Sequence, residues 1–202
     1  MINVPKSKLL FFDLETVGIE RDFKTLKQNR PELARLFESY QSWFIKRYPE
    51  ELGKTIDEIF YNKSALIPEF AKIIVASFAF YAPDGELHTQ TFSSDSEVEV
   101  LNEVKILLNK VGKHDFHLCG HNIKSFDIPM LGKRMLINGI KPPSLIPSYE
   151  TKPWEIKAVD TKDVWQFGNN YSVASLDLMC VSMGIKSPKT GEVSGNIVHQ
   201  SY

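Results

Sequence analysis

The sequence predicts an α/β domain with a mixed central sheet, flanked by helices and carrying a helical insertion after the first strand. Short apolar runs of strand type alternate along the second half of the chain with stretches of helical periodicity. Residues 71–81 and 87–92 flank the turn-forming segment 82–86, which indicates an antiparallel hairpin within the sheet. This order of elements is typical of a mixed sheet covered by helices.

The individual elements follow from apolar pattern and from turn residues. We expect strands over residues 9–16, 71–81, 87–92, 116–119 and 159–161. We expect helices over residues 94–111, 125–138 and 173–183, the last of them ending at Gly184. The inner face of the first of these helices is predicted to consist of Val98, Leu101, Val104, Leu107 and Leu108. The proline-rich segment 142–153 is expected to be a loop.

The insertion, about residues 18–68, has a helical pattern. One helix is expected from Pro31, because proline is favoured in the first helical turn, and its apolar residues recur at helical spacing as Leu33, Phe37, Tyr40 and Phe44. Thr55 is expected to cap a second helix. The aromatic residues expected in the core are Trp43, Phe44 and Tyr48. The basic residues suit either a nucleic-acid guide or an ordinary mixed-charge surface: Arg21, Lys24, Lys27, Arg30, Arg35, Lys46 and Arg47.

Length and composition predict one domain over residues 1–202, because 43% of the chain is hydrophobic and 13 residues are phenylalanine. The net charge of -1 does not describe a general polycation, although a nucleic acid held through metal ions needs only a local basic surface. Cys119 and Cys180 have no metal-type spacing and are expected to be buried thiols in a reducing compartment. With no membrane-length apolar stretch and no signal peptide, we expect a cytoplasmic protein with no membrane partner; the residues predict no oligomeric state.

Two carboxylates, Asp13 and Glu15, follow the apolar run at 8–12, which predicts a buried strand that delivers them as it ends. Side chains two residues apart on a strand share a face, so the two lie about 7 Å apart along the backbone. Adjacent anions repel unless a cation lies between them, and hard oxygen ligands suit Mg²⁺ or Mn²⁺. The pair therefore predicts a divalent metal site, although an acidic strand end that meets water has the same pattern.

A second polar constellation, residues 120–131, lies at a predicted strand-to-helix junction. Ser125 is expected to cap the helix and to place Asp127 in its first turn, where the helix dipole favours an ionised carboxylate. This carboxylate is expected at the same end of the sheet as Asp13. Asn122 offers an amide to a phosphate or sugar oxygen, and the ring of Phe126 suits either the core or base stacking.

Two further residues, Asp160 and His121, are expected near this site, where they would support its ligands without binding the metal. Asp160 ends the last predicted strand, where it either supports the site or bonds the backbone or Lys162. His121 lies in the junction loop and is expected to be satisfied by hydrogen bonds rather than to bind a metal. Asp177 is expected on a solvated helix face.

The segments Phe-Asp-Leu-Glu-Thr at 12–16 and Gly-His-Asn-x-x-x-Phe-Asp-Ile-Pro-x-Leu at 120–131 resemble the first two motifs of the DEDD superfamily of 3′–5′ exonucleases. The chain is similar to stand-alone relatives of the proofreading exonuclease domain of family B DNA polymerases. The resemblance implies a ribonuclease H-like fold, two Mg²⁺ or Mn²⁺ ions in the intact site, and a nucleic-acid substrate with a single-stranded 3′ end, DNA in preference to RNA. It implies catalytic and metal-binding roles for Asp13, Glu15 and Asp127, and substrate contacts for Leu14, Thr16, Asn122 and Phe126.

The third motif of that family, a Tyr or His four residues before a fourth carboxylate, is absent from this chain, in which no acid follows Glu192. Either a C-terminal helix is missing from these 202 residues, or the protein has lost its fourth ligand. Because three carboxylates leave Mg²⁺ geometry under-specified, we expect the 202-residue chain by itself to hydrolyse little. A non-catalytic nucleic-acid or protein-binding module on the same fold stays open as the alternative to an exonuclease.

Overall fold

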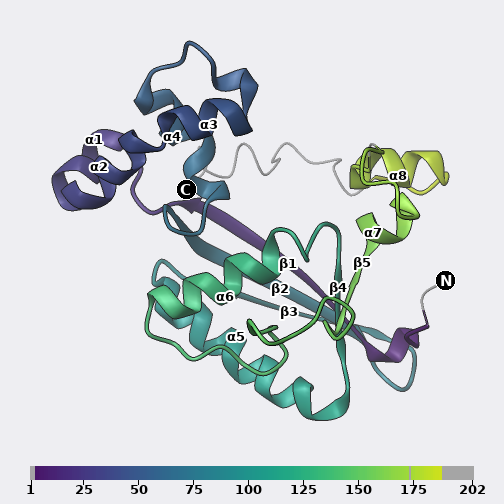
Figure 1. Cartoon of the computed structure of the whole chain (residues 1–202). Helices are drawn as coiled ribbons and strands as arrows, with labels where there is room; N and C mark the ends of the chain where they lie inside the picture. Colours follow the sequence, from purple (N-terminus) through teal and green to yellow (C-terminus); the bar gives the residue numbers. More distant parts are fainter. Residues whose placement is uncertain (1–2, 173, 188–202) are drawn as a thin grey trace. The chain divides into compact units, whose positions relative to one another are not determined.

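Five strands within the described part of the chain form one sheet, in the order β3-β2-β1-β4-β5 (Figure 1). The computed structural model describes residues 3–172 and 174–187. The strands are β1 (Leu9–Gly18), β2 (Ala71–Tyr81), β3 (Leu87–Ser93), β4 (His117–Gly120) and β5 (Ala158–Asp160). The predicted α/β class is confirmed.

The sheet is mixed, as predicted. β2 and β3 form the expected antiparallel hairpin. β1 pairs in parallel with β4, from Leu9 opposite His117 to Phe11 opposite Cys119, and β4 pairs in parallel with β5. The carboxyl ends of β4 and β5 therefore lie at the same edge of the sheet, next to the middle of β1.

β1 contains Asp13 and Glu15, as predicted, but it runs two residues beyond the predicted end at residue 16. Because the strand continues to Gly18, the two carboxylates lie inside it rather than at its end. Buried Phe12 and Leu14 alternate with the more exposed Phe11, Asp13 and Glu15, which is the period of two of an extended strand. What ends beside the two carboxylates is β4, which stops at Gly120.

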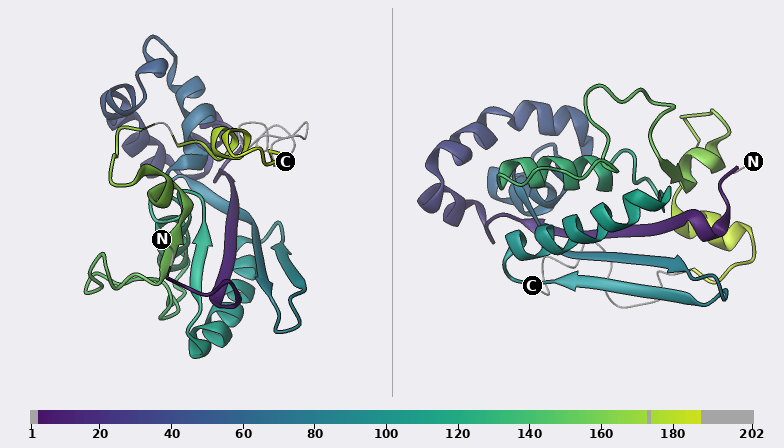
Figure 2. Two further views of the ribbon diagram at one scale, coloured as in Figure 1. Left: turned by 90° about the vertical axis from the view of Figure 1, so that its right-hand side faces the viewer. Right: turned by 90° about the horizontal axis from the view of Figure 1, so that it is seen from below.

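Two helices, α5 (Glu97–Val111) and α6 (Asp127–Ile137), cover one face of the sheet (Figure 2). The core includes a buried row of alternate β1 residues, Leu10, Phe12 and Leu14. Phe12 stacks on Phe78 of β2 with 5.0 Å between ring centroids. Because these side chains occupy one face of β1, Asp13 and Glu15 project from the other.

The inner face of α5 differs from the prediction at one end. Leu101, Val104 and Leu108 are buried, but Val98 is 45% exposed, and Val100 is buried in the first turn. The prediction for Val98 is wrong because the buried face consists of Val100, Leu101, Val104 and Leu108, and Val98 lies to one side of it.

The buried carboxylate of Glu97 ties three elements of this layer together. It accepts hydrogen bonds from the Ile73 amide of β2 at 2.8 Å and from Arg134 Nε of α6 at 2.8 Å. Asn138 Nδ2, just beyond α6, donates to the same carboxylate at 2.9 Å. Arg134 is only 2% exposed, so this ion pair is buried. A buried ion pair is stable only when its groups are hydrogen-bonded, and these bonds meet that need.

Two short helices, α7 (Thr161–Gln166) and α8 (Leu176–Ser182), follow β5. α8 begins after the predicted start at residue 173, which lies outside the described residues. The predicted end is confirmed, because Gly184 adopts a positive φ of 69° just beyond the helix. Asp177 is exposed, and both cysteines are buried and free, as expected. Over residues 3–172 and 174–187, none of the helices has the length and apolar character needed to cross a bilayer.

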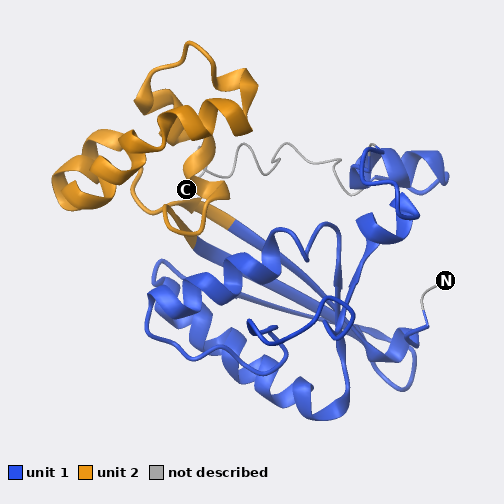
Figure 3. Cartoon of the chain, in the orientation of Figure 1, with its two compact units in different colours: residues 1–15, 73–194 blue, residues 16–72, 195–202 orange. Residues whose placement is uncertain are grey.

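The chain divides into two compact units (Figure 3). Unit 1 takes in the described residues among 1–15 and 73–194, and unit 2 takes in residues 16–72. Unit 2 corresponds closely to the predicted insertion at 18–68. Both β1 and β2 pass from one unit into the other.

Unit 2 contains α1 (Phe23–Asn29), α2 (Pro31–Ser39), α3 (Gln41–Arg47) and α4 (Ile56–Lys63). Thr55 caps α4 as predicted, and it does so in a capping box with Glu58. The centre of the unit is Phe37, whose ring is fully buried. Its centroid lies 4.5 to 5.8 Å from those of four other phenylalanines: Phe23, Phe44, Phe60 and Phe70.

The surface of unit 2 carries mixed charge. Four of its basic residues pair with nearby carboxylates: Arg21 with Asp22, Lys27 with Glu38, Arg30 with Glu20, and Arg35 with Glu32. These pairs favour the ordinary surface over a dedicated nucleic-acid guide. Trp43, predicted to be core, is 48% exposed because it lies beside the buried face of α3 that Phe44 occupies.

Phe37→Ala should destabilise unit 2, because it removes the ring that contacts all the others in the aromatic cluster and leaves a cavity. We expect a loss of about 3–5 kcal/mol in the free energy of unfolding, measured by urea denaturation. Trp43→Ala is the matched control, with an expected loss below about 1 kcal/mol for a half-exposed ring. Equal losses for the two variants would contradict this assignment of the core.

Candidate active site

The candidate site lies where β4 and β5 end beside β1. The last paired residue of β1 opposite β4 is Phe11, so the β1 residues from Asp13 onward have no β4 neighbour. In open α/β sheets, the carboxyl ends of parallel strands are where ligands bind. The four acidic positions singled out from the sequence all belong to segments at this edge: Asp13, Glu15, Asp127 and Asp160.

Asp127 is joined to β1 directly. It is the first residue of α6, is only 3% exposed, and its Oδ1 accepts the backbone N–H of Leu14 at 3.1 Å. Leu14 is one residue from both Asp13 and Glu15. The structure therefore places Asp127 beside the β1 backbone between Asp13 and Glu15, although it is more than a hundred residues from them in the sequence.

The pKa values of the three carboxyl groups are all raised. Burial raises the pKa of Asp127 to about 7, and the negative charges of Asp13 and Asp160 contribute to the shift. Partial desolvation raises the pKa of Asp13. The pKa of Glu15 is raised by desolvation and by the nearby charge of Asp13. Raised pKa values in neighbouring, partly buried acids are a feature of functional sites.

Within the described residues, the acidic side chains lie near one another but do not form a complete set of metal ligands. Among residues 3–172 and 174–187, no three carboxylate, imidazole or thiol side chains are grouped closely enough to hold a metal ion. Asp13 is exposed and Glu15 half-buried, while Asp127 is held on the Leu14 amide. The arrangement is an acidic cluster on one side of β1 with its most buried member fixed by the backbone.

The loop between β4 and α6 places Asp127. A Cβ atom at Gly120 would lie 2.7 Å from the carbonyl oxygen of Phe12, so only glycine lets the loop pass this close to β1. Asn122 then adopts a positive φ of 64°, and its carbonyl accepts the amides of Ser125 and Phe126. This turn delays the helix. α6 begins at Asp127 with Phe126 at the capping position and no side-chain cap, so the predicted capping role of Ser125 is wrong.

Asp160 fixes the same loop from the other side. It is 2% exposed, and its two oxygens accept three backbone amides: Asn122 at 2.7 Å, Lys124 at 3.0 Å and Lys162 at 3.0 Å. The third bond caps the start of α7. Of the two roles that the sequence leaves open, this geometry favours the backbone-bonding one. Asp160 supports the loop that carries Asp127.

The first turn of α7 supplies partners that sequence reasoning missed. The hydroxyl of Thr161 lies 3.0 Å from Nδ1 of His121, so the histidine is satisfied within the loop, as expected. Lys162 Nζ donates to Oδ1 of Asn122 at 2.9 Å. Asp163 pairs with Lys124 at 3.0 Å. The signal for these contacts is the polar run that directly follows β5, which could have been recognised as facing the other polar loop.

The predicted substrate-contacting residues have different environments. The side chain of Leu14 is buried, which leaves its backbone amide as the part that reaches the site. Thr16 belongs to unit 2, where its hydroxyl donates to the carbonyl of Ala65 at 2.8 Å. Phe126 is half-buried at the start of α6, and the Asn122 side-chain oxygen is bonded to Lys162.

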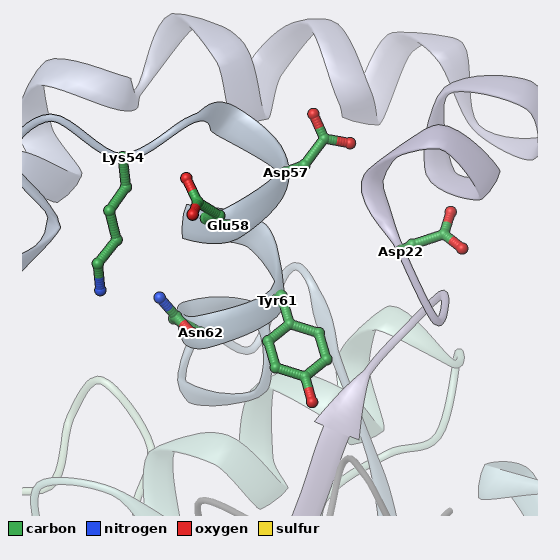
Figure 4. Close-up of a pocket in the computed structure, with 6 residues that line it drawn as sticks. All are labelled: Asp22, Lys54, Asp57, Glu58, Tyr61 and Asn62. Atoms are coloured by element: carbon green, nitrogen blue, oxygen red, sulfur yellow. The ribbon is translucent and has the colours of Figure 1, made fainter.

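A separate hollow in unit 2 is lined mainly by polar side chains whose bonds are local (Figure 4). Asp22 accepts the Thr25 amide at the start of α1, and Glu58 belongs to the capping box of α4. Lys54 and Asn62 both bond to the buried Glu51. These bonds give four of the lining residues a structural role within unit 2: Asp22, Lys54, Glu58 and Asn62. They do not indicate a second functional site.

The fold and the site together define an α/β domain with a cluster of acids where its parallel strands end. Comparison of the chain with protein families agrees with this class. Residues 65–202 match the model of a family described as predicted 3′–5′ exonucleases related to the exonuclease domain of PolB. Since the match spans more than half of the chain, the protein belongs to this family, and the resemblance drawn from its two motifs is confirmed.

Solved structures with a similar fold include the family B DNA polymerase from the hyperthermophilic archaeon Pyrobaculum calidifontis, with a TM-score of 0.55 and 14% identity over 97% of this chain and 21% of the polymerase. The zinc-bound complex of E. coli ExoI with single-stranded DNA gives a TM-score of 0.44 and 11% identity over 96% of this chain and 39% of ExoI. The chain thus spans about a fifth of the polymerase. The polymerase supports the ribonuclease H-like exonuclease fold that the motifs predict. No curated protein matches the chain.

Asp160→Asn should loosen the loop that carries Asp127. One carboxylate oxygen is replaced by an NH₂ group that faces backbone donors, so we expect a loss of about 2–4 kcal/mol in the free energy of unfolding. Asp163→Asn is the control, because its ion pair with Lys124 is exposed and should be worth less than about 1 kcal/mol. Urea denaturation of both variants tests this, and unchanged stability of Asp160→Asn would show that its three bonds are dispensable.

The stability of the metal-free protein should fall as pH rises through the range where Asp127 titrates. With a folded-state pKa of about 7 against an ordinary 3.8, the folded protein holds a proton that the unfolded chain has lost. The resulting penalty is absent below about pH 4 and complete above about pH 7, reaching roughly 4 kcal/mol.

The test compares wild type with Asp127→Asn in EDTA at pH 5 and pH 8, by urea denaturation. Asparagine keeps an oxygen for the Leu14 amide but does not titrate, so it should lose clearly less stability than wild type between these pH values. Parallel losses in the two proteins would mean that Asp127 is not the buried acid responsible.

Proposed function

We propose that this protein is a metal-dependent 3′–5′ exonuclease that hydrolyses phosphodiester bonds at single-stranded 3′ ends, DNA in preference to RNA. The observation that carries the proposal is the meeting of Asp127 with the acidic pair of β1. Its carboxylate bonds to the amide between Asp13 and Glu15, and its pKa is raised partly by the charge of Asp13. Family membership supplies the polarity of the reaction.

The donor set suits a hard divalent cation. Asp13, Glu15 and Asp127 offer only carboxylate oxygens, the ligands that Mg²⁺ and Mn²⁺ prefer. Burial raises the pKa of all three, and neighbouring negative charge adds to the rise for Glu15 and Asp127. A cation is therefore the missing charge partner. Two such ions, when bound, would activate a water molecule and offset the charge on a phosphate.

Each of the three residues would have a distinct part. Asp13 and Glu15 project from one face of β1 and would hold a cation between them. Asp127, fixed by the Leu14 amide, would complete the ligand set directly or through water. Because its pKa is near 7, Asp127 would change charge within the working pH range, and cation binding would drive its ionisation.

The choice of DNA rests on the family, which is described by its relation to the exonuclease domain of PolB. In the site itself, the half-buried ring of Phe126 and the amide of Asn122 lie on the loop that leads to Asp127. A base and a sugar or phosphate oxygen are the groups these side chains would contact.

The alternative is a non-catalytic nucleic-acid or protein-binding module. It is favoured by one observation, the absence of a three-ligand group among the described residues. The two functions differ in their requirement for a cation. An exonuclease needs Asp13 and a divalent ion for its reaction, whereas a binding module holds nucleic acid equally well in EDTA.

Asp13→Asn should remove both cation binding and 3′ shortening while leaving the fold in place. The experiment incubates the protein with 3′- and 5′-labelled oligonucleotides in Mg²⁺, Mn²⁺ or EDTA, and measures Mn²⁺ binding by calorimetry. Slow, cation-dependent loss of nucleotides from the 3′ end is expected for wild type. Asp177→Asn, on an exposed helix face, is the control and should behave as wild type.

Three outcomes would count against the proposal. Wild-type turnover by Asp13→Asn would remove the proposed site. Shortening from the 5′ end would remove the polarity. Oligonucleotide binding that is unchanged by EDTA and by Asp13→Asn, with no hydrolysis and no Mn²⁺ binding, would establish the binding module instead.

A further inference from the structure

Lys162 lies in the first turn of α7, and none of the roles described above uses its charge. Its backbone N–H donates to Oδ1 of Asp160 at 3.0 Å, and the same oxygen accepts the Asn122 amide at 2.7 Å. One carboxylate oxygen therefore holds the backbones of Lys162 and Asn122 together. Since Asp160 is only 2% exposed, this anchor is shielded from water.

The side chains of the two anchored residues also meet. Lys162 Nζ donates to Oδ1 of Asn122 at 2.9 Å, and both residues are half-buried. A lysine can only donate hydrogen bonds, so the atom of the Asn122 amide that faces it must be the oxygen. The NH₂ group of Asn122 is thereby turned away from Lys162.

The two side chains keep N–H donors that the fold does not use. Over residues 3–172 and 174–187, the Asn122 NH₂ group makes no hydrogen bond, and it is not among the buried side-chain atoms there that lack one. It is therefore in contact with solvent. The ammonium group of Lys162 has further N–H groups besides the one that it donates to Asn122.

The charge of Lys162 is not taken up by an ion pair within the described part of the chain, whereas the neighbouring Lys124 pairs with Asp163 at 3.0 Å. Asp160, which caps the same turn, gives its oxygens to three backbone amides. A half-buried cation beside a free amide NH₂ group suits an anion with several acceptor oxygens, such as a phosphate.

These donors lie beside the candidate active site. The carbonyl of Asn122 accepts the amide of Phe126, the residue before Asp127. The charge of Asp160 contributes to the raised pKa of Asp127, so the anchor of the two donors is within electrostatic reach of the acidic cluster. An anion held here would lie next to the cations proposed above.

We propose that Lys162 and Asn122 together bind one phosphate near the 3′ end of the single-stranded substrate and so position the strand against the acidic cluster. The proposal rests on the proposed function, which supplies the strand. Lys162 is then a positioning residue. The alternative is that the lysine only holds Asn122 in place. The alternative does not require a positive charge, because Asp160 already fixes the Asn122 backbone and a neutral donor could bond its side-chain oxygen.

The first test measures binding of fluorescein-labelled (dT)₁₂ by anisotropy in EDTA, which removes the cations needed for hydrolysis. Lys162→Gln removes the charge but keeps an N–H donor for Asn122. One phosphate contact to a single strand contributes about 0.7 to the slope of log K against log salt, so this variant should lower the slope by about 0.7 and weaken binding about fivefold at 0.1 M salt. Lys162→Arg keeps the charge and should keep the wild-type slope. Lys110→Gln, an exposed lysine of α5, is the matched control and should bind as wild type.

The second test finds the phosphate that is bound. Strands of (dT)₁₂ carry one uncharged methylphosphonate at the first, second or third linkage from the 3′ end. At one of these positions, the substitution should weaken wild-type binding about fivefold and leave Lys162→Gln unaffected, because the variant has already lost that contact. Equal weakening of the two proteins at all three positions would overturn the proposal.

The third test measures 3′ shortening in Mg²⁺, with circular dichroism to check that each variant is folded. Lys162→Gln should raise KM about fivefold and leave kcat unchanged, because the phosphate contact is made equally before and during the reaction. A lower kcat with an unchanged KM and salt slope would mean that the lysine only holds the loop. If wild type shortens (dT)₁₂ and Lys162→Gln matches it in both constants, this proposal alone is wrong. If wild type neither binds nor shortens the strand, the proposed function is wrong as well.

Discussion

The hydrogen bond from the Leu14 amide to Asp127 is the interaction on which the candidate site depends. β4 has only four residues and stops at Gly120, so this β1 amide has no β4 residue to bond. A buried amide without a partner costs about 1–3 kcal/mol. Asp127 removes that cost and in doing so fixes the start of α6 against the middle of β1. The same bond that completes the sheet therefore brings a distant acid beside Asp13.

The acids at this edge of the sheet have different roles, which follow from their burial and their hydrogen bonds. Asp160 is almost fully buried and spends both oxygens on three backbone amides. Asp127 is equally buried but accepts only one amide from another residue, so its charge is poorly compensated and its pKa rises. Asp13 is exposed and accessible from solvent. Asp160 thus orders the loop, while the carboxylates of Asp13 and Asp127 are left available for a ligand.

Local patterns in the sequence were sufficient for much of this arrangement. The helix cap at Thr55 and the place of Asp127 in the first turn of α6 follow from short motifs whose geometry is fixed by neighbouring residues. The misses depend on distant contacts. The positive φ of Asn122 delays α6, and it is held by Asp160, 38 residues away in the chain. The exposure of Trp43 depends on which side of a short helix packs inward, which spacing alone does not decide for adjacent aromatic residues.

The parallel pairing of β1 has a consequence for the order in which the chain can fold during synthesis. The β4 partner of Leu9 is His117, which lies more than a hundred residues later in the chain and therefore leaves the ribosome well after it. Meanwhile, the helices of unit 2 make contacts that are close in sequence and can form sooner. The apolar start of β1 must stay unpaired on that side through this interval, when exposed strand edges are prone to aggregate. The strand that carries the acidic pair therefore completes its pairing only when β4 has been made.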